Sequence, residues 1–256
     1  MNTGQSIRIR DITDETGSAL VLDFTRGFLG SEFKNITDAL SNVTEENTDA
    51  IILSPGEAQR HNDIICKKRV PFIVKCDWSN RLLDERSLYP AQRFRQVLAC
   101  SAADVLRFGA SAAVIDVFFG TPDIDTVEGI QALRALVEGG AEAGLPVIAS
   151  IIPFGSRVSK DNYADVIGLG MRVCLEIGAT TAAVPVVAAS DARKLVAASS
   201  KCPLFANAAF TSPLAPVNNF AVSVKAMRSE GIPAVIIDGF NLPAPVDELR
   251  RMFFNH

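Results

Sequence analysis

Lys75 and Asp77 close an apolar run that begins at Pro71, and no other residues in this chain point so directly to chemistry. Burial at the end of such a run disfavours the ammonium form. It would lower the pKa of Lys75 and make its amine a nucleophile or a base. A lysine in this place can instead be held by a salt bridge to a neighbouring acid. At this point the sequence leaves both interpretations open.

Several other apolar runs also end on a side chain that can bind a ligand or move a proton. An acid in such a place is also compatible with a helix cap or a solvated loop. Several acids and one lysine that face a common mouth would nevertheless form a site. We predict as catalytic residues Lys75, Asp23 and Asp116. We predict as substrate-binding residues Asp77, Arg26, Ser150, Asn207 and Asp238.

Eight short apolar runs alternate with helical segments along the chain, and they are the elements that must position these residues. The runs lie at about 19–23, 50–54, 71–77, 112–118, 146–152, 179–187, 203–207 and 233–238. Continuous apolar runs are typical of parallel strands that are covered on both faces. The count and order predict an α/β fold, a single-domain (β/α)8 TIM barrel over 19–256 that follows an N-terminal segment, 1–18. The strand ends would then meet at one mouth.

A doubly wound open sheet is the alternative fold. It calls for a glycine-rich phosphate loop after the first strand, and the two glycines of 25–30 do not match G-x-G-x-x-G. The segment 78–100, after the third strand, holds the single tryptophan and several arginines. We expect a long irregular loop there, acting as a lid or an interface arm with a possible anion contact.

Composition narrows the class of protein. The net charge of −4 and the scattered basic residues argue against nucleic acid or a membrane surface as partner. No apolar run approaches the roughly 20 residues of a membrane span, and the N-terminus lacks the apolar core of a signal peptide. Five widely spaced cysteines fit reduced thiols in a cytoplasmic protein. With only two histidines, a zinc site built on imidazoles or a Ser-His-Asp triad is not expected.

Five segments follow the order and spacing of motifs from one enzyme family. They are 19–27, 49–56, 101–120, 144–155 and 176–179. Together they resemble the archaeal-type class I fructose-bisphosphate aldolases and their relatives, the DeoC/LacD/DhnA-like group. The resemblance covers about 20–241. It implies a TIM barrel, a C–C lyase that works through a Schiff base, a small-molecule substrate and a homo-oligomer.

The departures from this family fall on its catalytic positions. In the resemblance, Ala183 stands in place of the Schiff-base lysine, Ile152 in place of the tyrosine and Phe24 in place of a histidine. The phosphate-binding glycines correspond to 207–209, and the arginine near the last strand is missing from 238–241. An alanine cannot form an imine, and a phosphate would lack its clamp. We expect an unphosphorylated substrate, or a phosphate bound by the arginines of 78–100.

Three functions remain open from the sequence. The first is an aldolase-like lyase acting on a keto or hydroxy-carbonyl compound, with Lys75 as nucleophile or general base and no cofactor. The second is an acid–base or Mg²⁺/Mn²⁺ lyase or isomerase in which Lys75 is a cation that stabilises an enolate. The third is a non-catalytic paralogue that kept the barrel. The apolar end 252–254 is a modest hint of a homo-oligomer, and packing of these residues against the chain's own helices is an equal alternative.

Overall fold

Parallel strands make up the centre of the molecule. The computed structural model describes residues 1–25, 35–80, 94–199, 202–210, 212, 214 and 220–254. The barrel strands are β1 (Ala19–Asp23), β2 (Ala50–Leu53), β3 (Phe72–Lys75), β6 (Ala112–Phe119), β7 (Val147–Pro153), β8 (Thr181–Pro185), β9 (Leu204–Asn207) and β10 (Ala234–Asp238). They close into a barrel in the order β1-β10-β9-β8-β7-β6-β3-β2. The predicted TIM barrel is therefore confirmed.

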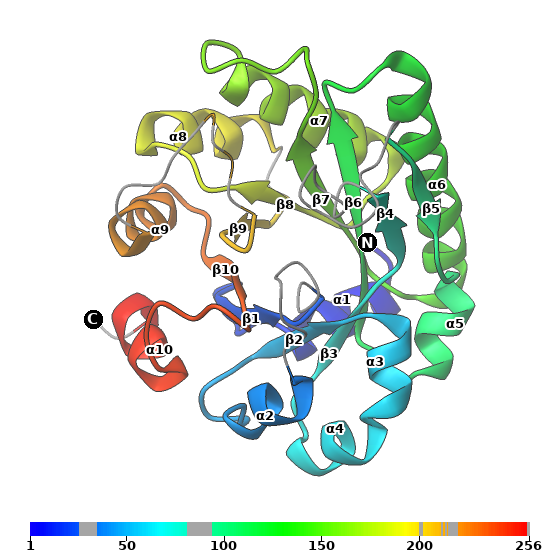
Figure 1. Cartoon of the computed structure of the whole chain (residues 1–256), viewed down its shortest axis with the longest axis vertical. Coiled ribbons are helices and arrows are strands. Elements are labelled where there is room, and N and C mark those ends of the chain that lie inside the picture. The colour runs from blue at the N-terminus through cyan, green and yellow to red at the C-terminus, as the bar shows by residue number, and fades with distance from the viewer. Residues whose placement is uncertain are drawn as a thin grey trace.

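Helices surround this ring of strands, as Figure 1 shows. They are α1 (Thr3–Asp11), α2 (Ile36–Ser41), α3 (Pro55–Arg60), α4 (Asn62–Lys68), α5 (Ala102–Arg107), α6 (Asp123–Ala143), α7 (Tyr163–Ile177), α8 (Ala189–Ala198), α9 (Phe220–Ser229) and α10 (Val246–Phe254). The cap of α5 follows from its sequence, because Ser101 and Asp104 each accept a hydrogen bond from the other's backbone N–H. His61 leaves the helical conformation and separates α3 from α4.

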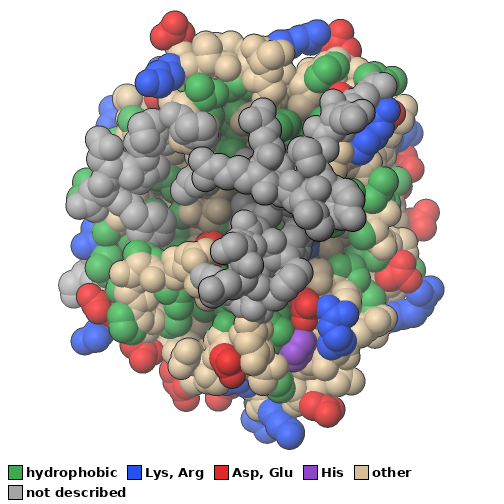
Figure 2. Space-filling view, viewed as in Figure 1, with side chains coloured by type: hydrophobic (Ala, Val, Ile, Leu, Met, Phe, Trp, Pro, Cys, Tyr) green, Lys and Arg blue, Asp and Glu red, His purple; other side chains and the backbone are tan. Residues whose placement is uncertain are grey.

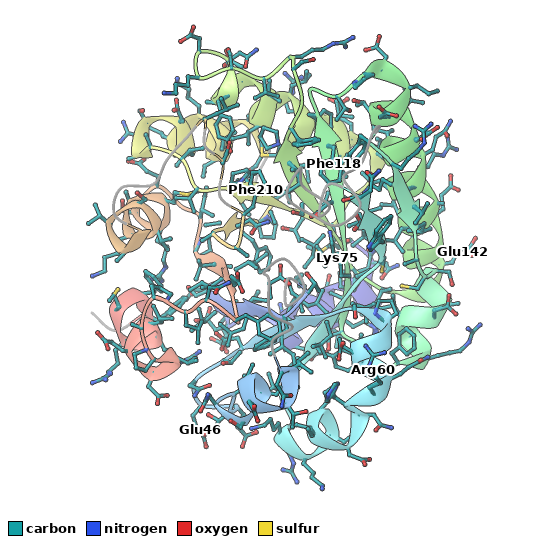
Figure 3. The ribbon with its side chains drawn as sticks, in the orientation of Figure 1. Glu46, Arg60, Lys75, Phe118, Glu142 and Phe210 are labelled. Carbon is teal, nitrogen blue, oxygen red and sulfur yellow. The ribbon has the colours of Figure 1, made fainter. Side chains whose placement is uncertain are left out.

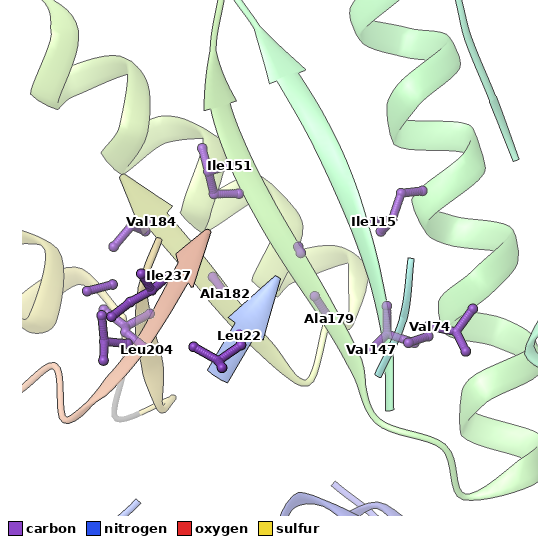
Figure 4. Close-up of a cluster of buried hydrophobic side chains, with 14 of the residues drawn as sticks. Leu22, Val74, Ile115, Val147, Ile151, Ala179, Ala182, Val184, Leu204 and Ile237 are labelled. Atoms are coloured by element: carbon purple, nitrogen blue, oxygen red, sulfur yellow. The ribbon is translucent and has the colours of Figure 1, made fainter. Parts of the chain in front are cut away.

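Strand alternation decides which side chains reach the barrel interior. The inner cluster includes Ile73 on β3 and Val114 on β6. The residues next to them, Val74 and Ile115, belong to the larger cluster between strands and helices, part of which is drawn in Figure 4. Because alternate residues point to opposite faces, Lys75 faces the interior as Ile73 does. The barrel geometry therefore aims the last residue of β3 at the mouth.

The N-terminal segment is part of the barrel and not an appendage. Ile9 and Ile12 belong to the same buried cluster as the first residues of several strands. The Asn2 side chain donates to the carbonyl of Ala141 at 2.8 Å, and Gln5 donates to that of Leu145 at 3.3 Å. Helix α1 thus covers the end of the barrel where the strands begin. This role could not be predicted because the sequence of α1 is polar and its amphipathic pattern is weak.

The segment after β3 is more ordered at its ends than expected. Two short strands, β4 (Asp77–Ser79) and β5 (Gln96–Leu98), pair antiparallel, with Trp78 opposite Val97. Residues 81–93 lie outside the described part of the chain, so the predicted lid or arm is not addressed there. The irregular loop predicted over the whole of 78–100 is wrong at both ends. Strands β4 and β5 form by pairing with each other, and neither segment has a strand periodicity in its own sequence.

The C-terminal aromatic residues contact their own chain. Phe253 is buried in the main core, and the Arg228 guanidinium lies 4.2 Å from the centre of the Phe254 ring. The hint that these residues form an exposed partner surface was therefore wrong. A homo-oligomer remains a prediction that rests on the family resemblance alone.

Candidate functional site

A cavity opens where the barrel strands end. Its empty volume is about 750 Å³ when the open space at the mouth is included. Its lining consists of Asp23, Thr25, Ile52, Ser54, Lys75, Asp77, Trp78, Ser79, Val114, Asp116, Ser150, Asn207 and Ile236. Six of the eight residues predicted as site residues are therefore brought together at this one mouth.

Three charged side chains on one side of the cavity form an ion triad, Asp77–Lys75–Asp116. The Lys75 Nζ atom lies 2.8 Å from Asp77 Oδ1 and 2.7 Å from Asp116 Oδ2. The side chains of Lys75 and Asp116 are 15% and 14% exposed, and that of Asp77 is 1% exposed. The Nζ atom itself is covered. Figure 3 shows Lys75 inside the ring of strands.

The triad reverses the expected protonation behaviour of Lys75. Burial alone lowers the pKa of this lysine, as the sequence suggested, but the negative charges of Asp116 and Asp77 outweigh burial. The net effect raises the pKa of Lys75 above its ordinary value. Lys75 is therefore an ammonium at neutral pH, which is neither a nucleophile nor a base in this state. Of the two interpretations that the sequence left open, the salt bridge to neighbouring acids describes Lys75 in the structure.

Asp77 is held in place from three directions. Its Oδ1 accepts a hydrogen bond from the backbone N–H of Asp116 at 2.9 Å. Its Oδ2 accepts one from Gln96 Nε2 at 2.7 Å, and the same amide donates to the carbonyl of Asp116 at 2.6 Å. Burial raises the pKa of Asp77, helped by the nearby charge of Asp116, while Lys75 counters the shift. Asp77 therefore fixes the lysine within the triad.

Asp23 lies across β2 from the triad, at the end of β1. Its Oδ1 accepts hydrogen bonds from the backbone N–H of Thr25 at 2.9 Å and from the Thr25 hydroxyl at 2.6 Å. These contacts orient the carboxylate at the cavity wall. Asp23 and Asp116 are thus two carboxylates on different parts of one mouth, an arrangement that suits proton transfer at a bound molecule.

Ser150 and Asn207 supply polar groups on the third side of the cavity. The Asn207 Oδ1 accepts from the backbone N–H of Phe210 at 3.2 Å, which orients the amide. Its Nδ2 then donates to Ser150 Oγ at 3.1 Å. Because the Ser150 oxygen accepts this bond, its own proton is available as a donor. A substrate oxygen in the cavity is a suitable acceptor.

Apolar side chains occupy the positions that, by the resemblance, hold the family's catalytic residues. Ala183 and Ile152 are fully buried, and Phe24 is almost so. Ile152 belongs to a cluster with Phe118 and Phe210, both labelled in Figure 3. None of these three side chains can form an imine or transfer a proton.

The carboxylates of the cavity are oxygen donors of the kind that a divalent metal ion would need. Lys75 lies between Asp77 and Asp116, where its ammonium supplies the positive charge that a bound cation would bring. Across the described ranges, no three His, Cys, Asp or Glu side chains gather as metal ligands would. The magnesium or manganese alternative thus gains no support from the arrangement of these carboxylates.

One predicted site residue stands apart from the cavity, and a second lies outside the described residues. Asp238 is not among the lining residues, and its carboxylate accepts hydrogen bonds from Phe240 N–H at 2.9 Å and Asn241 Nδ2 at 2.6 Å. The Asp238 carboxylate therefore stabilises the turn that follows β10. Arg26 lies outside the described residues. Among the arginines of 78–100, Arg95 contacts Asp125 at 3.2 Å and does not line the cavity.

Sequence reasoning missed Gln96 and assigned no site role to Trp78. Trp78 was noticed as the single tryptophan of the chain, and it lines the cavity directly after Asp77. Gln96 reaches the triad only because β5 pairs with β4. The position of Trp78 next to Asp77 was a usable signal, whereas nothing in the local sequence marks Gln96.

A comparison with known families decides which one this chain is part of. The model of the DeoC/LacD family of aldolases matches residues 12–201, well over half of the chain. The chain belongs to the DeoC/LacD aldolase family. This membership confirms the resemblance and supports an aldolase-like lyase that acts on a small molecule.

On the face shown in Figure 2, basic and acidic side chains are interspersed around the rim.

Solved structures share the fold at low sequence identity. An archaeal fructose 1,6-bisphosphate aldolase matches with a TM-score of 0.79 and 14% identity, over 98% of this chain and 100% of its own. A Schiff base forming fructose-1,6-bisphosphate aldolase matches with a TM-score of 0.78 and 15% identity, over the same shares of the two chains. A 2,3-dimethylmalate lyase matches with a TM-score of 0.55 and 16% identity, over 98% of this chain and 86% of its own.

In the described part of this chain, no helix is long and apolar enough to cross a membrane.

Proposed function

We propose that this member of the aldolase family is an aldol-type lyase in which Lys75 acts as a charged ammonium and not as an imine-forming amine. Its substrate is a small, uncharged hydroxy-carbonyl compound. The ion triad carries the proposal, because two carboxylates within 2.8 Å of Nζ keep the lysine protonated. A fixed positive charge beside a cavity stabilises negative charge that develops on a bound molecule.

The reaction needs a base, a place for the electron pair and a route for the proton. In the cleavage direction, the Asp23 carboxylate removes the proton from the hydroxyl on the β-carbon. The C–C bond breaks, an aldehyde leaves, and the bonding pair forms an enolate on the other fragment. Protonated Asp23 then returns its proton to the carbon of that enolate, which restores the carboxylate. The Lys75 charge and the Ser150 hydroxyl stabilise the enolate oxygen.

The charges of the cavity favour an uncharged substrate. Among the described residues, the lining contains the carboxylates of Asp23, Asp77 and Asp116 and one cation, Lys75, which two of these carboxylates already neutralise. A phosphate or carboxylate group on the substrate would add negative charge to a lining that is already net negative. This agrees with the missing phosphate clamp expected from the sequence.

Imine formation at Lys75 is the second candidate, and one observation favours it. Lys75 is the lysine of this cavity lining, and Asp116 is placed to receive its proton at 2.7 Å. Attack on a carbonyl, however, requires the covered Nζ to move out from between the carboxylates and also to lose a proton. Contact between the Lys75 ammonium and a substrate oxygen requires the same movement of Nζ but no loss of a proton.

Exchange of carbon-bound hydrogen tests the proposed function without knowledge of the full substrate. We expect the protein in D₂O to exchange the α-hydrogens of dihydroxyacetone or hydroxyacetone, because enolate formation is half of the reaction. The loss of the ¹H signal measures the rate, with the Lys75→Met protein as the control. Borohydride added to the same mixtures is expected to leave the protein mass unchanged. EDTA is expected to leave the exchange rate unchanged.

Three outcomes would count against the proposal. If no ketone of the panel exchanges faster with the wild-type protein than with Lys75→Met, the lyase assignment fails. A borohydride-dependent mass increase that disappears in Lys75→Met would establish the imine instead. Loss of exchange in EDTA, restored by Mg²⁺ or Mn²⁺, would point to metal catalysis.

A further inference from the structure

Two of the five cysteines lie side by side at the base of the paired strands β4 and β5. Cys76 directly precedes β4, and Cys100 follows β5 by two residues. The backbone N–H groups of Ala99 and Cys100 both donate to the carbonyl of Cys76, at 2.6 and 3.4 Å. Two residues on one strand thus oppose a single residue on the other, as in a β-bulge. The bulge places residue 100 next to residue 76, although 23 residues separate them in the sequence.

The two thiols contact each other inside the protein. Both side chains belong to the main buried cluster. The Cys76 thiol has two acceptors within reach, the carbonyl of Val74 at 3.4 Å and the sulfur of Cys100. The hydrogen bond from Cys76 lowers the pKa of Cys100, although burial opposes this shift. The same bond and burial raise the pKa of Cys76 well above its ordinary value. Cys100 is therefore the member of the pair that ionises first.

Access to solvent distinguishes the two cysteines in the same sense. Cys100 is 9% exposed, whereas Cys76 is 0% exposed. A small oxidant reaches the thiol that is both more exposed and more readily ionised, because the thiolate is the reactive form. Cys174 provides a contrast, since it is fully buried and burial raises its pKa to about 12. The pair thus has one thiol suited to attack and a second thiol placed to react with the product.

We propose that Cys76 and Cys100 form a peroxide-reactive dithiol site that closes into a disulfide at the base of β4 and β5. The Cys100 thiolate attacks one oxygen of hydrogen peroxide, the O–O bond breaks, and the departing hydroxide takes up a proton to become water. The sulfur of Cys76 then attacks the sulfenic acid on Cys100. The S–O bond breaks, and the hydroxide leaves as water with the proton of Cys76. The two thiols lose two electrons, which reduce one peroxide to two water molecules.

The disulfide would act on the support of the ion triad. It closes a covalent loop over 76–100, which contains both β4 with Asp77 and β5 with Gln96. A bond that closes a loop stabilises the folded chain, chiefly because it restricts the unfolded one. Oxidation is therefore expected to hold the two strands together at their base. This inference does not depend on the proposed function, because disulfide formation requires no substrate turnover.

Peptide mapping of the whole protein tests the proposed bond directly. The reduced protein is treated with hydrogen peroxide, free thiols are blocked with N-ethylmaleimide, and trypsin releases Cys76 within 76–81 and Cys100 within 96–107. We expect these two peptides to be joined, with a mass two hydrogen atoms below their sum. The oxidised protein should melt several degrees higher than the reduced one, and dithiothreitol should reverse both changes.

Two variants separate the roles of the thiols. In Cys76→Ala the sulfenic acid on Cys100 has no partner, so dimedone should capture it there. Cys66→Ala is the matched control, because Cys66 is exposed and lies outside the pair. This variant should form the same bridge as the wild-type protein.

Several results would overturn the inference. Absence of the joined peptides at peroxide concentrations that oxidise Cys66 would do so, as would a bridge from either cysteine to Cys66 or Cys202 in place of the proposed one. A missing dimedone adduct on Cys100 in Cys76→Ala would contradict the order of the two steps. An oxidised protein that melts no higher than the reduced one would contradict the clamp. If Cys76→Ala does not fold, the joined peptides and the melting temperature of the wild-type protein decide.

Discussion

Replacing Lys75 by methionine is expected to lower the free energy of unfolding at pH 7 by about 3–5 kcal/mol, the usual cost of removing one partner from a buried ion pair. The substitution keeps the length and apolar stem of the side chain. It leaves Asp77, whose side chain is 1% exposed, and Asp116 without their cation. Urea unfolding followed by circular dichroism measures the change.

The pH dependence of this loss has a defined sign. The pKa of Lys75 is raised in the folded protein, so its stabilising contribution is present below the ordinary lysine pKa and disappears only in alkaline solution. The pKa of Asp77 is also raised, and it should rise further without Lys75. The folded variant then binds a proton more readily than the unfolded chain. The stability difference between Lys75→Met and wild type should therefore shrink from pH 7 to pH 5.

Two controls isolate the ion triad as the cause. Lys194→Met removes an exposed lysine paired with Asp191 at 3.0 Å, and it should change stability little. The double variant Lys75→Met/Asp77→Asn removes one uncompensated charge and should recover part of the lost stability. An equal loss in Lys194→Met, or a wider gap between Lys75→Met and wild type at pH 5, would contradict the arrangement described for the triad.

Replacing Asp23 by asparagine is expected to slow α-hydrogen exchange of a responsive hydroxy-ketone by about 10²–10⁴-fold, the usual contribution of a positioned acid–base group. Asparagine keeps the Oδ1 atom that accepts hydrogen bonds from Thr25, so the turn after β1 should be preserved. The change removes proton transfer and leaves the local structure in place. Exchange rates from ¹H NMR in D₂O, with melting temperatures alongside, measure the effect.

Asp238→Asn is the matched control for this prediction. Asp238 pairs with Asp23 in the register of β1 and β10, but its carboxylate holds its own turn and does not line the cavity. We expect its exchange rate to stay within about twofold of wild type, since only groups at the cavity take part in proton transfer. If Asp238→Asn slowed exchange as much as Asp23→Asn, the assignment of the base to Asp23 would fail. The predicted role of Asp238 in binding would then regain support.

The barrel could be predicted because its signals are local. Each strand is a short apolar run, and the rule that TIM barrel sites lie at the strand ends led to Lys75, Asp23 and Asp116. Helix α1 was missed because only Gln5 and Ile9 are buried within an otherwise polar helix. Strands β4 and β5 were missed because each is three residues long and depends on the other.

The chemistry of the site was harder to predict because it depends on distances between strands. The sequence showed an apolar run ending in Lys75, and burial alone implied a lowered pKa. The pKa of Lys75 is raised instead because Asp116, on the neighbouring strand of the barrel, lies 2.7 Å from Nζ. Gln96, which holds Asp77, could not be found by any local pattern. Charge pairing across a sheet is a property of register, and register appears only in the folded chain.

The charge state of Lys75 is the point on which the proposed reaction depends most. Its Nζ resonance can be assigned in a ¹⁵N-labelled protein by comparison with Lys75→Met, and then followed across an alkaline titration. An ammonium held between two carboxylates should titrate above the ordinary lysine pKa of about 10.4. A Lys75 pKa several units below that value would contradict the proposal and restore the lysine as a nucleophile.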